Sequence, residues 1–396
     1  MHGGALGPPL TRADLAGPHV SVLNLGGLAN PDVLRVRRDG APPLVVKDWS
    51  RRSAFVRALV APLLVRHELA MLERVAGVPG VPKPGGRVDR LALALEWVDG
   101  RPLRRRTHGG ALPAAFFGAL EGILAALARR GVVYFDLRSP SNVLVTPSGA
   151  PVLVDLGSAF ALPLPAALRL ALERRALAKL RARFERRGAE APVRAAPDDV
   201  GRDLKVAGTR FRVREREGAA DARPVVLLPG AGYSARALEP IAAELASRGR
   251  RTLSVDLPGF GGSRRRVTSL APARLAEQLD ALLAALRISS AEFCAAGLGA
   301  LAADALARRA PTRVAKLVAI DADDPHGRSA AVRDPEALRA HLAARLPDAA
   351  RAELASAPAE NLALALLVEP TPISVRSLSW DEALAPGGVA SALSKP

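Results

Sequence analysis

The stretch from residue 225 to residue 263, VVLLPGAGYSARALEPIAAELASRGRRTLSVDLPGFGGS, decides the fold of the second half of the chain. Two apolar runs, PVVLLPG and RTLSVDLPG, each end in a Pro-Gly turn, and a helical pattern over residues 235–247 separates them. A second helical pattern over residues 272–286 precedes two more apolar runs, AEFCAAG and VAKLVAIDA. Strands that alternate with helices in this way predict a parallel α/β sheet.

These runs resemble the first half of an α/β-hydrolase, from residue 205 to about residue 325. The resemblance implies that LPGAG supplies an oxyanion-hole amide at Ala231 and that AAGLG, residues 295–299, occupies the G-x-S-x-G nucleophile turn. Gly297 stands at the serine position and Leu298 follows it. Because glycine has no nucleophilic atom, an acyl-enzyme cannot form at this turn. We therefore expect a degenerate hydrolase site that binds a ligand or acts as a scaffold, with hydrolase activity unlikely.

The residues that should complete a hydrolase triad are also missing from the pattern. The family places a histidine late in the chain, but the last histidine here is His341, within the helical pattern LRAHLAARL. The tail after residue 360 lacks two final strand patterns, so the sheet is expected to be truncated. Asp321, Asp323 and Asp324 follow the last strand and are positioned to mimic a triad acid, although such loops are commonly acidic and solvated.

A second informative stretch, GVVYFDLRSPSNVLVTPSGAPVLVDLG, covers residues 131–157 and spaces two aspartates and an asparagine between short apolar strands. In phosphoryl-transfer sites of this pattern, one carboxylate accepts the proton of an attacking hydroxyl, while an amide oxygen and a second carboxylate hold metal ions. Asp136 fits the base, and Asn142 and Asp155 fit the metal ligands. The strands would present these groups at their ends.

Residues 20 to 188 consequently resemble a compact member of the protein-kinase-like superfamily, closest to bacterial lipopolysaccharide-kinase-like and RIO-like proteins. The resemblance implies a site for ATP with Mg²⁺ or Mn²⁺. Lys47 would pair with the α and β phosphates and Glu68 would orient it. The hinge, Glu96 to Val98, would bind the adenine. A glycine loop with Gly26 and Gly27 would cover the phosphates, and Arg138 would face the γ-phosphate.

Departures from the usual kinase pattern limit the choice of acceptor. Tyr134 and Phe135 replace the His and Arg of the common HRD triplet, and no APE motif follows. A docking platform for peptides is therefore not expected, and a sugar, lipid or other small hydroxyl acceptor is favoured over a protein. The main hypothesis is an ATP-dependent phosphotransferase. A nucleotide-binding pseudokinase regulator and an α/β-hydrolase family enzyme with an atypical site remain alternatives.

The predicted organisation is an N-terminal tail (1–19), a compact α+β kinase-like domain (20–188), a linker rich in Gly, Pro and Ala (189–204) and an α/β parallel-sheet domain (205–396). The formal charge of +17 comes largely from arginines, 50 of 56 basic residues. Because these are spread along the chain, nucleic-acid binding is not expected. A single cysteine, Cys294, no visible secretion signal and no long apolar span predict a cytoplasmic protein without a transmembrane segment.

Overall fold

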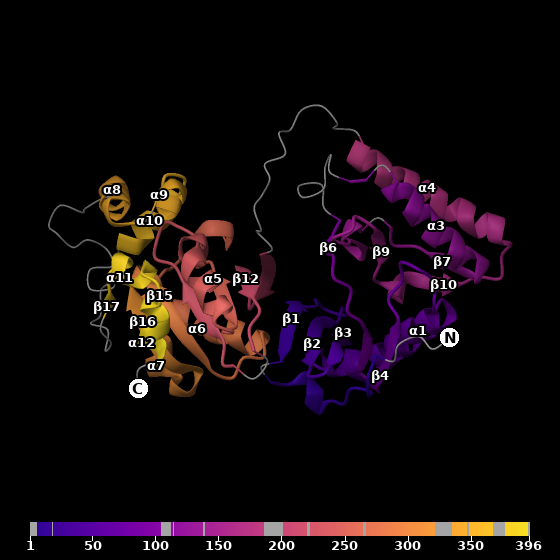
Figure 1. Cartoon of the computed structure of the whole chain (residues 1–396), viewed down its shortest axis with the longest axis horizontal. Helices are drawn as coiled ribbons and strands as arrows, with labels where there is room; N and C mark the ends of the chain where they lie inside the picture. Colours follow the sequence, from indigo (N-terminus) through magenta and orange to yellow (C-terminus); the bar gives the residue numbers. More distant parts are fainter. Residues whose placement is uncertain are drawn as a thin grey trace. The chain divides into compact units, whose positions relative to one another are not determined.

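A computed structural model describes residues 6–17, 19–103, 112–113, 115–137, 139–185, 201–219, 222–263, 267–320, 335–346, 348–366 and 377–394. The contacts divide the chain into two compact units (Figure 1). Unit 1 comprises residues 1–16 and 26–198, and unit 2 comprises residues 17–25 and 199–396. The strand β1 (Val20–Asn24) therefore groups with unit 2.

Unit 1 begins with antiparallel strands in the order β2–β3–β5–β4. In β2, valine and leucine alternate with arginine, and every second side chain is buried because successive side chains of a strand point to opposite faces. The bounds of these strands are β2 (Asp32–Arg38), β3 (Ala41–Asp48), β4 (Pro84–Asp89) and β5 (Ala92–Glu96).

A helical segment follows β3 and changes its geometry near Pro62. A π-helical turn, η2 (Val56–Val60), leads directly into α1 (Ala61–Arg74), which has the proline in its first turn. Proline is tolerated there because its missing N–H has no helical partner to lose. The face of α1 that carries Val65, Glu68 and Leu72 is buried.

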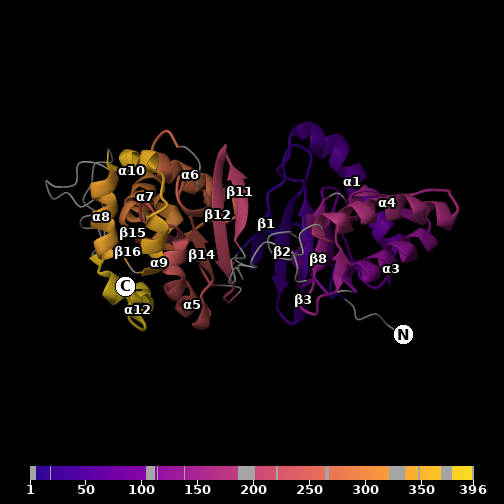
Figure 2. The ribbon, with the colours of Figure 1, turned by 90° about the horizontal axis from the view of Figure 1, so that it is seen from above.

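The rest of unit 1 packs two long helices beneath short strands. The helix α3 is apolar on the face that contacts α4, and both views show the two helices together (Figure 2). A Pro-Ser-Gly turn joins β8 to β9, with Gly149 at φ +80°. The elements are β6 (Arg101–Pro102), α3 (Phe116–Arg129), β7 (Val132–Tyr134), β8 (Val143–Val145), β9 (Pro151–Leu153), β10 (Ala159–Ala161) and α4 (Ala166–Glu185). The kinase-like fold of this unit stays a prediction.

Unit 2 is built on a sheet with the order β11–β12–β14–β13–β15–β16–β17. The neighbouring strands β14, β13, β15, β16 and β17 are parallel to one another. The strand β12 is antiparallel to β14, and β11 is antiparallel to β12. The prediction of a parallel α/β sheet is therefore confirmed for the main part of the sheet. The bounds are β11 (Arg202–Val206), β12 (Thr209–Arg216), β13 (Val225–Leu228), β14 (Thr252–Val255), β15 (Ala291–Ala296), β16 (Val314–Ile320) and β17 (Ser377–Leu378).

Helices cover this sheet, and α7 packs against β15 and β16. In the described part of the tail, one two-residue strand, β17, extends the sheet beyond β16. The helices are α5 (Glu239–Ser247), α6 (Pro272–Ala285), α7 (Gly297–Arg309), α8 (Pro335–Arg345), α9 (Asp348–Leu354), α10 (Ala359–Leu366), α11 (Trp380–Leu384) and α12 (Gly388–Ser394). Among the described residues, no helix has the length and apolar character needed to cross a bilayer.

Candidate functional site

The turn between β15 and α7 has the geometry of a nucleophile elbow. Gly297 has φ +46°, a left-handed conformation that glycine adopts without the penalty other residues incur. Two residues later, a Cβ at Gly299 would lie 2.5 Å from the carbonyl oxygen of Pro229 and 2.8 Å from the Cβ of Leu228. The absence of side chains at these two glycines therefore lets the start of α7 approach the end of β13 closely.

The loop after β13 lies beside this elbow and is held by its neighbours. Ala231 and Tyr233 are buried, and the Tyr233 hydroxyl lies 2.7 Å from where a Cβ of Gly230 would stand. The amide of Ser234 donates a hydrogen bond of 2.8 Å to a carboxylate oxygen of Glu353 on α9. The loop that the sequence assigns to an oxyanion hole is thus fixed by buried contacts.

Asp256 organises the same region, a role that the sequence reading did not assign. Its side chain is completely buried at the end of β14. It accepts hydrogen bonds from the amides of Ala235, at 2.9 Å, and Gly262, at 2.7 Å, and it forms an ion pair of 2.9 Å with Arg214. Asp256 therefore ties the loop after β13 to the DLPGFGGS turn.

The nucleophilic side chains described near the elbow are engaged elsewhere. Cys294 is fully buried, and burial raises the pKa of its thiol to about 12, so it is protonated at neutral pH. The Ser234 hydroxyl accepts from the amide of Arg236, and the Ser263 hydroxyl donates to the carbonyl of Asp256. The predicted acids Asp321, Asp323 and Asp324 lie outside the described residues, as does the side chain of His341.

In unit 1, three of the predicted residues meet in one buried cluster. Lys47 Nζ lies 2.5 Å from Glu68 Oε1 and 2.7 Å from Asp155 Oδ1, and the first two residues are 7% and 2% exposed. Burial alone would lower the pKa of Lys47, but the two carboxylates outweigh burial and raise it above its ordinary value. Burial would raise the pKa of Asp155, yet Lys47 holds it below its ordinary value. Burial raises the pKa of Glu68 although Lys47 acts in the opposite direction, so the shifts favour the ionised form for the Lys47–Asp155 pair.

A second group, around Asp136, lies against Tyr134. Asn142 Nδ2 donates to Asp136 Oδ2 at 2.9 Å and to the Tyr134 hydroxyl at 3.0 Å. Burial, followed by the nearby charge of Asp155 and that of Asp136, raises the pKa of the Tyr134 hydroxyl above its ordinary value. Tyr134, where kinases carry histidine, thus positions the asparagine and stays neutral.

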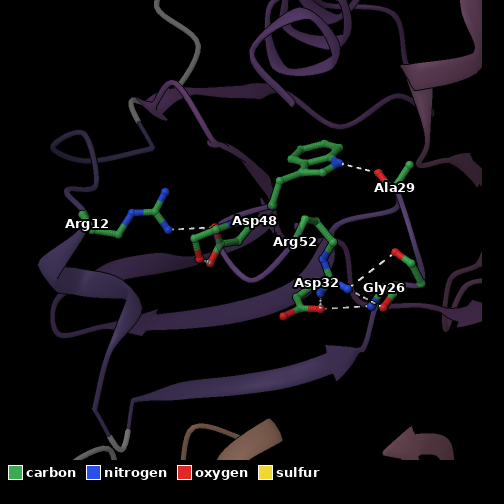
Figure 3. Close-up of polar contacts among 9 residues, drawn as sticks. Arg12, Gly26, Ala29, Asp32, Asp48 and Arg52 are labelled. Carbon is green, nitrogen blue, oxygen red and sulfur yellow. Dashed lines mark hydrogen bonds and ion pairs between the residues drawn. The ribbon is translucent and has the colours of Figure 1, made fainter. Parts of the chain in front are cut away.

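The remaining predicted residues of unit 1 are less well placed for a ligand. The Gly26 amide donates to Asp32 at 3.0 Å, and Gly27 is open to space (Figure 3). The amide of Glu96 donates to the Lys83 carbonyl at 2.9 Å, so this N–H is already used within the sheet. Val98 follows β5 in the expected hinge position, and Arg138 lies outside the described residues.

Comparisons with known proteins concern the hydrolase-like part. Residues 223–364, less than half of the chain, match a family model described as alpha/beta hydrolase fold. No curated protein matches the chain. Unit 2 therefore has an α/β-hydrolase fold in its family-matched part, as the sequence predicts.

Several solved structures are similar in part. A hydrolase from Pseudomonas aeruginosa PA01 is 22% identical over 46% of this chain and 80% of that chain, with a TM-score of 0.38. A mutant epoxide hydrolase of Vigna radiata is 25% identical over 31% of this chain and 38% of that chain, with a TM-score of 0.29. An alpha/beta hydrolase fold protein from Nakamurella multipartita is 26% identical over 31% and 41%, with a TM-score of 0.28. The chain spans less than half of the length of the latter two.

The predicted enzymatic activity requires correction. The expectation of a kinase-like phosphotransferase, with hydrolase activity unlikely in the second domain, is wrong, because the family match indicates an α/β-hydrolase enzyme. The backbone of the elbow, with Gly297 in the left-handed region and Gly299 against Pro229, does not depend on a hydroxyl at position 297.

Glu173 gives unit 1 a testable pH dependence. It is buried on α4, and one carboxylate oxygen accepts the amide hydrogen of Tyr134 at 2.7 Å. Burial raises the pKa of Glu173 from 4.5 to about 7, although the Tyr134 amide and Arg169 act in the opposite direction. A raised carboxyl pKa means that the folded state holds the proton more tightly. Its contribution to stability is therefore lost as the pH rises from about 4.5 to about 7.

We expect Glu173→Gln, which stays neutral and keeps an acceptor oxygen, to match the wild type near pH 4.5. Above pH 7 it should be more stable by up to about 3 kcal/mol, the equivalent of the pKa difference. Urea unfolding at both pH values measures this. A stability difference that is independent of pH would contradict the assignment.

Proposed function

We propose that unit 2 is an α/β-hydrolase family enzyme with an atypical site, which acts on a small carbonyl compound without forming an acyl-enzyme at the elbow. The observation that carries this proposal is the preserved elbow, with Gly297 in the left-handed region and Gly299 packed against the end of β13. The fold match supports the class of enzyme. The substrate class is inferred from what such an elbow can stabilise.

The chemistry follows from backbone amides. Ala296, the residue before α7, makes no side-chain cap, and the first amides of a helix have no acceptor within the helix. They also lie at the positive end of the helix dipole. The amides of Leu298 and Ala231 would therefore donate to an oxyanion that develops on the substrate carbonyl. Since Gly297 has no nucleophile, the attacking group would be water or a part of the substrate itself.

The proposal is tested with the full chain on a panel of p-nitrophenyl esters and thioesters. We expect turnover without a burst and without labelling by a fluorophosphonate probe. Gly299→Ala should lower turnover by about 10²-fold, because the added methyl meets the Pro229 carbonyl and displaces the amides from the developing charge. Gly118→Ala in α3, where a Cβ meets nothing within 4 Å, is the matched control and should be unchanged.

Three outcomes would contradict this function. Stoichiometric labelling of a serine in unit 2 would show a covalent nucleophile elsewhere. Equal turnover by Gly299→Ala and wild type, or no turnover across the panel, would show that the elbow does not carry the reaction.

We also propose that unit 1 binds a nucleotide with Mg²⁺ or Mn²⁺. Lys47, held between Glu68 and Asp155, supports this proposal. Among the described residues, no group of three or more His, Cys, Asp or Glu side chains is arranged to hold a metal. A site with one carboxylate, Asp155, and one amide, Asn142, nevertheless fits Mg²⁺, which keeps several waters and takes phosphate oxygens as ligands. The metal would neutralise phosphate charge.

Calorimetry with ATP in the presence and absence of Mg²⁺ tests this binding. Asp155→Ala should remove the metal-dependent part of the affinity, because the cation loses its carboxylate ligand. Glu121→Ala, which removes half of an exposed ion pair with Arg174, is the control and should bind as the wild type does. Equal metal-dependent binding by Asp155→Ala and wild type would exclude this site.

A further inference from the structure

The first helical segment of unit 1 exposes a row of large apolar side chains. Phe55, Leu59 and Leu63 are 66%, 59% and 66% exposed, although residues of this kind are normally covered. They are spaced four residues apart along the continuous run of η2 and α1, so they lie along one side of the helix. Leu28, in the neighbouring glycine loop, is 96% exposed. We call these four residues the apolar edge.

Buried contacts fix the apolar edge from behind. Trp49 is buried, and its indole N–H donates to the carbonyl of Ala29 at 2.8 Å. Arg52 donates to the carbonyl of Gly26 at 2.7 Å and forms an ion pair with the buried carboxylate of Asp32 (Figure 3). These bonds join the loop that carries Leu28 to the start of the helical segment. The apolar edge is therefore held in place on a folded support.

The charge around the apolar edge has one sign. Residues 50–67 contain four arginines and no aspartate or glutamate. Arg57 and Arg66 are exposed among the apolar side chains. The flanking acids Asp48 and Glu68 are buried and paired within the fold. Glu73, near the end of α1, is exposed, but within residues 50–67 every exposed charged side chain is an arginine.

We propose that the apolar edge docks on the surface of an anionic lipid bilayer. Apolar side chains on a helix enter the boundary between headgroups and acyl chains, while neighbouring arginines attract anionic headgroups. A second copy of this chain is a poorer occupant, because a symmetric contact would set Arg57 and Arg66 against the same arginines. Leu28 would enter beside the helix, and unit 1 would lie on the membrane without crossing it.

The experiment is co-sedimentation of the full chain with vesicles of phosphatidylcholine, alone or with phosphatidylglycerol. We expect binding to the anionic vesicles and weak binding to phosphatidylcholine alone. Leu59→Ser with Leu63→Ser should weaken binding at least tenfold, as should Arg57→Glu with Arg66→Glu. The matched control is Leu168→Ser with Leu172→Ser on α4, an apolar pair that is 49% and 47% exposed and also has basic neighbours. It should bind as the wild type does.

Each contrary result overturns the proposal. Wild-type protein that stays in the supernatant, or that binds neutral and anionic vesicles equally, excludes an anionic membrane surface. Equal losses for the α4 pair would show that binding is not specific to the apolar edge. A dimer in size-exclusion chromatography that Leu59→Ser with Leu63→Ser dissociates, without vesicle binding, would assign the edge to a second copy. Circular dichroism confirms that each variant is folded, since the substituted side chains are exposed.

Discussion

Replacement of Asp256 by alanine should lower the stability of unit 2 by about 3–5 kcal/mol, the range expected when one partner of a buried ion pair is removed. The substitution leaves Arg214, whose side chain is 12% exposed, without this carboxylate, and it removes the acceptor of the Ala235 and Gly262 amides. Buried donors that lose their acceptors add to the cost. The same change should disorder the loop after β13 and abolish turnover.

Two substitutions separate these contributions. Asp256→Asn keeps the shape of the side chain, but its NH₂ group faces donors only, so it should recover part of the stability and little turnover. Asp280→Ala removes a carboxylate that is 33% exposed and pairs with Arg313. It should cost about 1 kcal/mol or less. Chemical unfolding measures all three, and equal losses for Asp256→Ala and Asp280→Ala would show that burial does not decide the effect.

Local sequence patterns predicted the elements of unit 2 because each pattern is short and its structure follows from neighbouring residues. AAGLG predicted the elbow, and Gly297 indeed has a positive φ. Asp256 was not identified, since DLPGFGGS by itself indicates only a turn. Its partners Arg214 and Ala235 lie 42 and 21 residues away. A single sequence does not reveal such pairings.

The cluster in unit 1 shows that a long-range contact can be predicted when a family order supplies it. Lys47 and Glu68 are 21 residues apart, and their pairing was implied by the resemblance rather than by any local pattern. The contact of Lys47 with Asp155, 108 residues away, was not predicted. The apolar edge shows the opposite case. The sequence around Phe55, Leu59 and Leu63 did not indicate that these side chains stay exposed, because which face of a helix is covered depends on the elements that pack against it.

Glu215 should be the most sensitive position of the sheet in unit 2. It lies on β12, where one carboxylate oxygen binds Arg202 at 2.6 Å and the other binds Arg251 at 2.8 Å and the Ser21 hydroxyl at 3.0 Å. Arg251 is 2% exposed. Burial would raise the pKa of Glu215, but the two arginines outweigh burial and lower it to about 2. The carboxylate is therefore ionised and fully paired at neutral pH.

We expect Glu215→Ala to lower the free energy of unfolding by about 3–5 kcal/mol at pH 7, because it leaves two arginines without their buried counter-charge. A depressed carboxyl pKa stabilises the fold above the unfolded value of about 4.5, and this stability is lost as the pH falls toward 2. The difference between wild type and Glu215→Ala should therefore shrink between those values. Glu239→Ala, which breaks the exposed ion pair with Arg216, should cost less than about 1 kcal/mol at either pH. Urea unfolding at pH 7 and pH 3 measures these losses in the free energy of unfolding. A loss for Glu215→Ala that is as small as the loss for Glu239→Ala would show that the buried network does not stabilise the sheet. A loss for Glu215→Ala that grows in acid would show the same.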